Sequence, residues 1–157
     1  MKLVMERTKS DDARALVNIY HASYAENEKL GFPASASKVT IAEVQDWIKN
    51  TILLIAKEET TSKIIGTVRL KYHLEWQCYV LGRLAVNPSY KGMGIATRLM
   101  KFAENELTNL GETFVRLTVA QGHPYLPNMY IERGYKIVGE LLLDDMPYDE
   151  FIMEKLL

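Results

Sequence analysis

The chain has 157 residues, a net charge of −1 at pH 7 and a hydrophobic content of 48%. This length predicts one domain over residues 1–157, long enough to bury about two-thirds of the surface that the unfolded chain exposes. A charge so close to zero gives no general attraction for nucleic acid or anionic membranes, and no apolar run approaches a membrane span. We therefore expect neither nucleic acid nor a membrane as a partner.

Cysteine and histidine are scarce in the sequence. The single cysteine, Cys78, excludes an intrachain disulfide and fits a reducing compartment. The first residues lack the apolar core of a signal peptide, so we expect a cytoplasmic protein. Three scattered histidines, with no C-x-x-C and no H-E-x-x-H pattern, predict no metal site.

The first half of the chain predicts a strand, two helices and a hairpin of two strands. Ser10 is suited to capping the first helix, and Thr40 with Glu43 forms a capping-box pair for the second. Gly31 and Pro33 interrupt a polar loop between the helices. The expected elements are strand 3–7, a helix with an apolar stripe from 13 to 24, loop 26–37, a helix from 41, and strands 52–57 and 64–72.

The second half is organised around a strand that runs through a glycine turn into an amphipathic helix. Leu99, Met100 and Ala103 recur at helical spacing, and Gly111 suits the left-handed position that ends a helix. The expected elements are strand 77–86, turn 87–94, helix 95–111, strand 114–120, helix 128–133 and strands 135–143 and 149–156.

The glycine turn has a chemical use. The first N–H groups of a helix lack intrahelical partners, glycines at 92 and 94 let a ligand approach the backbone, and Lys91 adds a positive charge. Together they predict a site for phosphate or diphosphate. The Walker pattern is absent and the dinucleotide fingerprint fails at Thr97, although another nucleotide-binding arrangement stays open.

Lys91-x-x-Gly94-x-Ala96, preceded by Leu84-Ala85-Val86-x-Pro88, resembles the acyl-CoA-binding segment of the GNAT superfamily of N-acetyltransferases, with Lys where the family has Gln or Arg. The order of elements resembles that family from end to end. The resemblance implies an α+β, three-layer fold with the order β-α-α-β-β-β-α-β-α-β-β. Its central sheet would be mixed, mostly antiparallel and of about seven strands, with parallel fourth and fifth strands that splay apart.

The resemblance also implies where acetyl-CoA, the acyl donor, would bind. Backbone groups of the fourth strand and of the facing fifth strand would hold the pantetheine arm, and the glycine turn would hold the diphosphate. The expected cofactor-binding residues are Leu84, Ala85, Val86, Lys91, Gly92, Met93, Gly94, Ile95, Ala96, Thr97, Val119, His123 and Asn128. His123 stands where relatives often have Asn; it either substitutes as a hydrogen-bonding group or is an exposed loop histidine, and we favour the exposed histidine.

The segment Tyr130-x-x-x-Gly134-Tyr135 resembles the second signature of the family. The resemblance implies that Tyr130 is the general acid that protonates the departing thiolate, which its phenolic pKa near 10 would suit. The alternative is a tyrosine whose ring only packs on the sheet. Relatives often take a base from the fourth strand, but Gly82 leaves that place empty, so Glu75 is the nearest candidate base.

These features predict an N-acetyltransferase in which a primary amine attacks acetyl-CoA directly in a ternary complex. The alternative is a non-catalytic acyl-CoA-binding sensor on the same fold. The acceptor would be a small-molecule or peptide amine, bound near aromatic residues of the first two helices and the loop between them, Tyr20, Tyr24 and Phe32. The final strand, FIMEKLL, could also pair with a second copy to form a homodimer.

Overall fold

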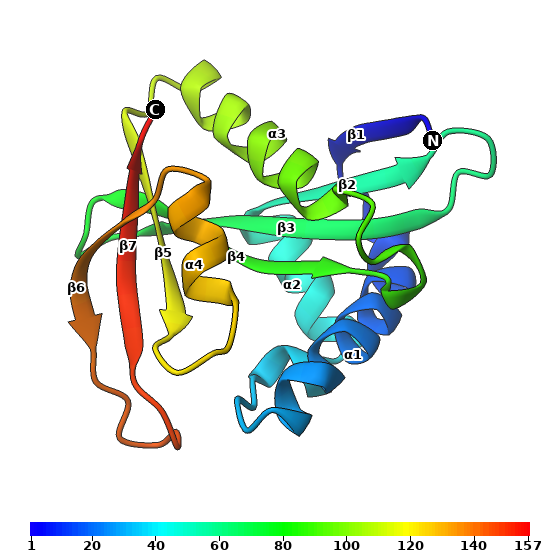
Figure 1. Cartoon of the computed structure of the whole chain (residues 1–157). Helices are drawn as coiled ribbons and strands as arrows, with labels where there is room; N and C mark the ends of the chain where they lie inside the picture. Colours follow the sequence, from blue (N-terminus) through cyan, green and yellow to red (C-terminus); the bar gives the residue numbers. More distant parts are fainter.

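The computed structural model describes residues 1–157 and contains a seven-stranded sheet with helices on both faces (Figure 1). The strands are β1 (Leu3–Arg7), β2 (Ile52–Glu58), β3 (Ile64–His73), β4 (Cys78–Val86), β5 (Phe114–Ala120), β6 (Lys136–Leu141) and β7 (Glu150–Leu156). The helices are α1 (Ala13–Lys29), α2 (Ile41–Asn50), α3 (Ile95–Asn109) and α4 (Leu126–Glu132), with single 3₁₀ turns at Ser10–Asp12, Ser35–Lys38 and Pro88–Tyr90.

The strands lie in the order β1-β2-β3-β4-β5-β7-β6, and every neighbouring pair except β4–β5 is antiparallel. The parallel pair is connected through α3, as a crossover between parallel strands requires. This confirms the expected mixed, mostly antiparallel sheet. The pair is short: only Tyr79 and Val80 of β4 are in register with Val115 and Arg116 of β5.

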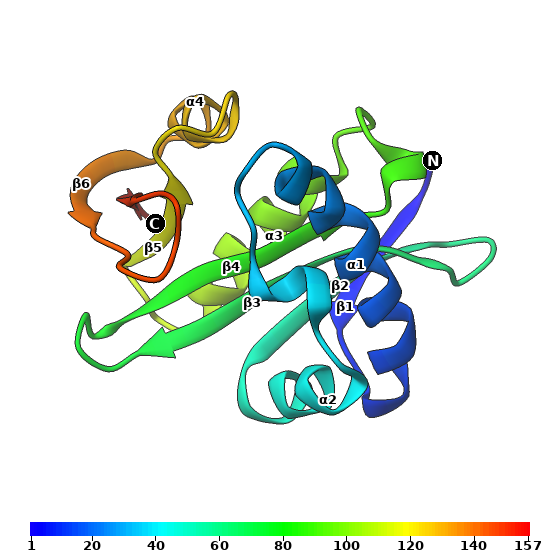
Figure 2. The ribbon, with the colours of Figure 1, turned by 90° about the horizontal axis from the view of Figure 1, so that it is seen from below.

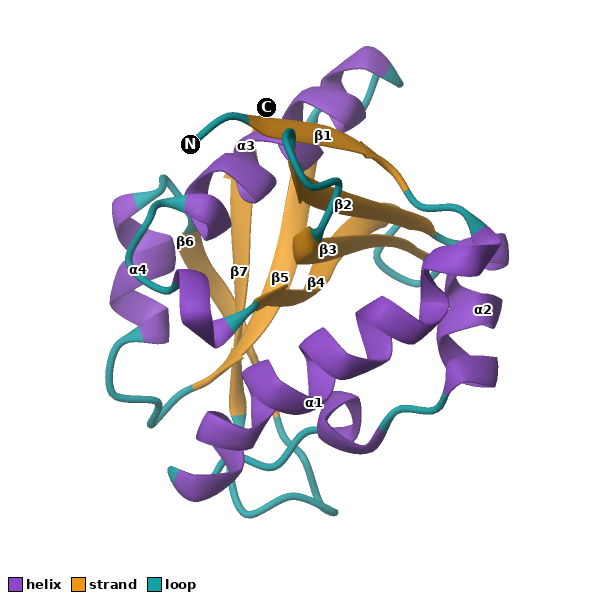
Figure 3. Ribbon diagram, turned by 90° about the vertical axis from the view of Figure 1, so that its right-hand side faces the viewer, coloured by secondary structure: helices purple, strands orange, loops and turns teal.

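Two apolar layers hold the helices on the sheet, because successive strand residues point to opposite faces. In β2, Leu53 and Ile55 pack with α1 and α2, whereas Leu54 and Ala56 pack with α3. Figure 3 shows α1 and α2 on one face and α3 on the other. Gly66 of β3 permits this close packing, since a Cβ there would lie 2.9 Å from Cδ1 of Leu99.

The helix starts follow the predicted capping only in part. Thr40 caps α2 as expected: its Oγ1 accepts from the N–H of Glu43, whose carboxylate accepts from the N–H of Thr40. Ser10 instead lies in a 3₁₀ turn that precedes α1. The loop expected from residue 26 begins later, because α1 continues to Lys29. The helix expected from residue 128 begins earlier, at Leu126, because Pro127 is tolerated in the first turn of a helix.

The last strand, β7, lies between β5 and β6 and is paired on both sides (Figure 1), and Figure 2 shows the C-terminus between those two neighbours. Its backbone N–H and C=O groups are therefore used within the sheet. The expectation that FIMEKLL pairs with a second copy is wrong, because no free edge is left on that strand. None of the helices combines the length and the apolar character that crossing a membrane requires.

Candidate active site

A bulge in β4 bends the strand where it leaves β5. The register with β3 passes from Arg69–Gly82 to Thr67–Ala85, which leaves one extra residue on β4. Arg83, in the bulge, has a φ of 51°, a conformation that costs a non-glycine residue energy. Bulges bend the strand that carries them, so β4 and β5 diverge soon after their last paired residues.

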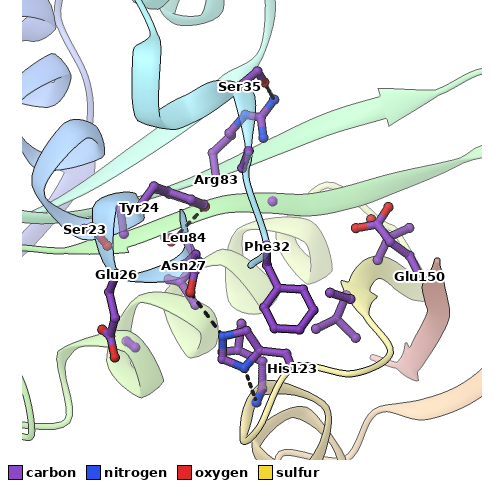
Figure 4. A pocket seen from close by; sticks show the side chains of 18 of the residues that line it. Ser23, Tyr24, Glu26, Asn27, Phe32, Ser35, Arg83, Leu84, His123 and Glu150 are labelled. Carbon is purple, nitrogen blue, oxygen red and sulfur yellow. Dashed lines mark hydrogen bonds between the residues drawn. The ribbon is translucent and has the colours of Figure 1, made fainter. Parts of the chain in front are cut away.

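The divergence opens a cleft of about 910 Å³ between the two halves of the sheet. It is lined by residues of α1, β4, β5, α4 and the segment that leads into β7 (Figure 4). The N–H of Asn87 donates to the carbonyl of Ile65 on β3. Because antiparallel residues alternate in direction, the backbone groups of Leu84 and Val86 point away from β3, toward the gap. The hydroxyl of Tyr24 already donates to the carbonyl of Leu84, 3.0 Å away.

One end of the cleft lies at the turn before α3. Gly92 and Gly94 have φ angles of 80° and 76°, and no atom lies within 4 Å of a Cβ built on either residue. The first helical hydrogen bond runs from the N–H of Arg98 to the carbonyl of Gly94, so the preceding N–H groups are without helical partners. The left-handed backbone explains the glycines, and the open space beside them would admit an anion.

The individual residues of this segment are placed differently. Lys91 and Ala96 line the cleft, while Met93 is exposed and the side chain of Ile95 is buried under the sheet. The hydroxyl of Thr97 accepts a hydrogen bond from Arg133, which ties α3 to α4. The N–H groups of the turn and the side chain of Lys91, rather than the side chains of Met93, Ile95 and Thr97, are therefore available to an anion.

Tyr130 lies at the other side of the gap. Its ring is buried against Tyr135, with centroids 6.0 Å apart, in the apolar layer that also holds Val119. Tyr130 lines the cleft, and no hydrogen bond is among the influences on the pKa of its hydroxyl. Burial raises the pKa of Tyr130, so the phenol keeps its proton at neutral pH.

His123 is buried, with 5% of its surface exposed, so the expectation of an exposed loop histidine is wrong. Its Nδ1 accepts from the N–H groups of Tyr125 and Leu126, at 3.4 and 3.2 Å, which requires the ring proton on Nε2. That nitrogen donates to Oδ1 of Asn27 at 3.1 Å. His123 thus fixes the start of α4 against the end of α1, which positions Tyr130.

Outside the glycine turn, three further expected site residues lie outside the cleft. Tyr20 is fully buried in the α1–α2 layer, edge-on to Trp47, because it points toward the sheet. Asn128 is exposed on α4. Glu75 is exposed in the turn before β4, at the end of that strand where β4 and β5 are still paired. Tyr24 and Phe32 do line the cleft, as expected.

Several charged residues of the cleft were not singled out by sequence reasoning, among them Glu150, Arg69 and Arg83. Glu150 is the first residue of β7, and burial raises the pKa of its carboxyl, an effect that contact with Thr118 and the charge of Arg83 partly offset. Arg69 and Arg83 come from β3 and β4. The sequence shows that each arginine lies in a predicted strand with alternating side chains. It does not show the bulge in β4 that places Arg83 in the cleft. No group of three or more His, Cys, Asp or Glu side chains is arranged to hold a metal ion.

Comparison with known proteins gives a consistent result. The sequence model of the Acetyltransferase (GNAT) family matches residues 14–135. Two relatives from Bacillus subtilis (strain 168) are similar: S-(2-succino)cysteine N-acetyltransferase, 28% identical over 88% of this chain and 85% of its own, and S-alkylcysteine N-acetyltransferase, 22% identical over 83% and 76%.

Among solved structures, the PaiA N-acetyltransferase from Thermoplasma acidophilum in complex with coenzyme A has a TM-score of 0.76 and 23% identity, and the match covers 100% of both chains. That likeness supports the fold, and the family match extends over most of the sequence. The chain therefore belongs to the GNAT family and is an acetyl-CoA-dependent N-acetyltransferase.

Proposed function

We propose that the protein transfers an acetyl group from acetyl-CoA to the primary amine of a small molecule, by direct attack in a ternary complex. The observation that carries the proposal is the cleft between β4 and β5, which has the glycine turn at one end and Tyr130 in its lining. The two relatives from Bacillus subtilis are named for acetylating cysteine derivatives, which supports a small-molecule acceptor.

The chain offers groups that fit the donor. N–H groups of residues 92–97, with Lys91, would hold the diphosphate, and the open space beside Gly92 and Gly94 leaves room for it. Backbone groups of Leu84 and Val86, with Val119 opposite, would bind the pantetheine arm. When bound, acetyl-CoA supplies the activated acyl group as a thioester.

Two residues would handle the protons. Glu150 accepts the proton that an ammonium group must lose, which leaves a nitrogen lone pair to form the C–N bond with the acyl carbon. Tyr130 donates its proton to the sulfur as the C–S bond breaks. The second proton of the attacking nitrogen returns through water to the phenolate, so Tyr130 is restored. Cys78 has no part in this scheme, because it is buried at the start of β4.

Release of CoA thiol, measured over a panel of primary amines, tests this function. We expect release that depends on the amine, together with an acetylated product of matching mass. Calorimetry with CoA on the same preparation separates the competing hypothesis of a non-catalytic sensor. Tight CoA binding without turnover of any amine would favour the sensor.

A further inference from the structure

Two arginines on the wall of the cleft have no anionic partner. The four ion pairs of the structure are Lys57–Glu6, Lys91–Glu26, Arg116–Glu154 and Lys155–Glu104. None involves Arg69 or Arg83, although both are partly buried and line the cleft. Charged groups are rarely buried without a counter-charge, so this pair calls for an explanation.

The guanidinium groups are held in place by neutral contacts. Their Cζ atoms lie 4.8 Å (Arg69) and 5.3 Å (Arg83) from the centroid of the Trp47 indole ring. One Nη of Arg83 donates to Oγ of Ser35 at 2.9 Å (Figure 4). The Nε atoms of both arginines are buried without any hydrogen-bond partner. Stacking on an indole stabilises the plane of a guanidinium but leaves the N–H groups at its edge unsatisfied.

This arrangement is costly without a ligand. Burial, and then repulsion from Arg83, lower the pKa of Arg69 to about 10. Arg83 also has a left-handed backbone inside a strand, whereas the other non-glycine residues with positive φ, Ser62 and Gln77, lie in turns. A strained residue with an unsatisfied charge at a binding cleft is a frequent mark of a ligand site.

The cleft also carries the complementary charge. Glu150, at the start of β7, is close enough to feel the positive charge of Arg83 but forms no ion pair with it. Figure 4 shows Glu150 and Arg83 on different sides of Phe32. Among the charged residues that line the cleft, Arg69 and Arg83 come from β3 and β4 and Glu150 comes from β7. Two unpaired cations with a separate carboxylate in the same cleft are a pattern that would bind a zwitterion.

We propose that the amine acceptor is an amino acid with a free carboxylate, which binds to Arg83 and Arg69 while its amine faces Glu150. This inference rests on the proposed function and adds the class of substrate. A planar, bidentate guanidinium suits a carboxylate. Phe32, Tyr148 and Leu143 line the same space, so an apolar side chain of the acceptor would be accommodated there.

Matched acceptors test the inference on the unmodified enzyme. L-methionine, L-methioninamide and 3-(methylsulfanyl)propylamine share one side chain and differ in the group beside the amine. We expect kcat/KM for L-methionine to exceed that for the other two by about 10-fold or more, as a charge-assisted hydrogen-bonded pair would give. Equal rates, or faster reaction of the amide, would overturn the carboxylate site while leaving acetyl transfer established. If neither these three compounds nor any other amine were acetylated, the result would instead count against the proposed function.

Variants locate the effect. R83Q and R69Q should each lower kcat/KM for L-methionine by about 10-fold or more and leave the slower reaction of L-methioninamide within about twofold, so the amide reports on correct folding. R14Q removes an exposed arginine of α1 and should change neither rate. An unchanged ratio of acid to amide in R83Q and R69Q would contradict the proposal. A loss of CoA affinity in these variants, measured by calorimetry, would also contradict it, because the arginines would then bind the donor rather than the acceptor.

Discussion

Nζ of Lys91 lies 2.8 Å from Oε2 of Glu26, which joins the last turns of α1 to the turn before α3. The pair favours the charged form of each group: the pKa of Glu26 is lowered and that of Lys91 is raised, mainly by their hydrogen bond. The Tyr125 hydroxyl also donates to Glu26, at 3.4 Å. A lysine expected to bind a diphosphate is therefore already engaged by a carboxylate, with which the ligand must compete.

Replacing Glu26 with Gln should tighten CoA binding. Both side chains are largely exposed, so we expect a gain in affinity of only about two- to threefold, larger at low ionic strength. Calorimetric titration with CoA at two salt concentrations measures it. Glu59→Gln changes the net charge equally at an exposed turn and is the matched control. Weaker binding in Glu26→Gln would show that the carboxylate assists the site.

Tyr130→Phe should lower kcat by about 100-fold, within the range for general acid catalysis, and leave CoA affinity unchanged. Stability should hardly change, because the ring stays buried and no hydrogen bond is among the influences on the pKa of the hydroxyl. Steady-state kinetics and a thermal melt measure both. In contrast, Tyr135→Phe loses a 2.9 Å bond to Glu104 and should cost about 1 kcal/mol of stability with little effect on kcat. Unchanged turnover in Tyr130→Phe would remove the proton-donor role.

Glu150→Gln should lower kcat/KM and change its dependence on pH. Burial raises the pKa of the Glu150 carboxyl, so the wild-type rate should increase with pH as this group loses its proton. The variant should lack that increase. Rates measured across the acidic and neutral pH range provide the test. Glu75→Gln is the control and should match wild type; if it alone removed the pH dependence, the base would be Glu75.

His123 should make folding stability depend on pH. Burial lowers the pKa of His123 in the folded protein below its ordinary value of 6.5. As the pH falls below about 6.5, the unfolded chain takes up the proton first, so stability is lost until the pH passes the folded pKa. Melting temperature against pH should show this decline.

The variant His123→Ala checks the origin of that decline. It loses the bonds to Asn27 and to the first N–H groups of α4, so we expect a cost of about 1–3 kcal/mol and a weaker pH dependence. His73→Gln removes a histidine from the end of β3 and is the control. An unaltered pH profile in His123→Ala would place the titration elsewhere.

The fold was largely readable from the sequence, and the binding side of the site less so. Apolar periodicity located every strand and helix, and glycines at 92 and 94 marked the turn, because both signals are local. The bulge at Arg83 depends on the pairing of β3 with β4, and no residue type in that segment predicts it. Likewise, the burial of His123 and Glu150 follows from contacts between distant segments. The sequence therefore predicted the donor-binding segment but missed the charges that face the acceptor.

A crystal structure with bound CoA tests the central claim most directly. We predict diphosphate oxygens within hydrogen-bond distance of N–H groups in residues 92–97, the pantetheine arm between β4 and β5, and the sulfur beside the Tyr130 hydroxyl. Pantetheine bound outside this gap, or a sulfur remote from Tyr130, would contradict the account.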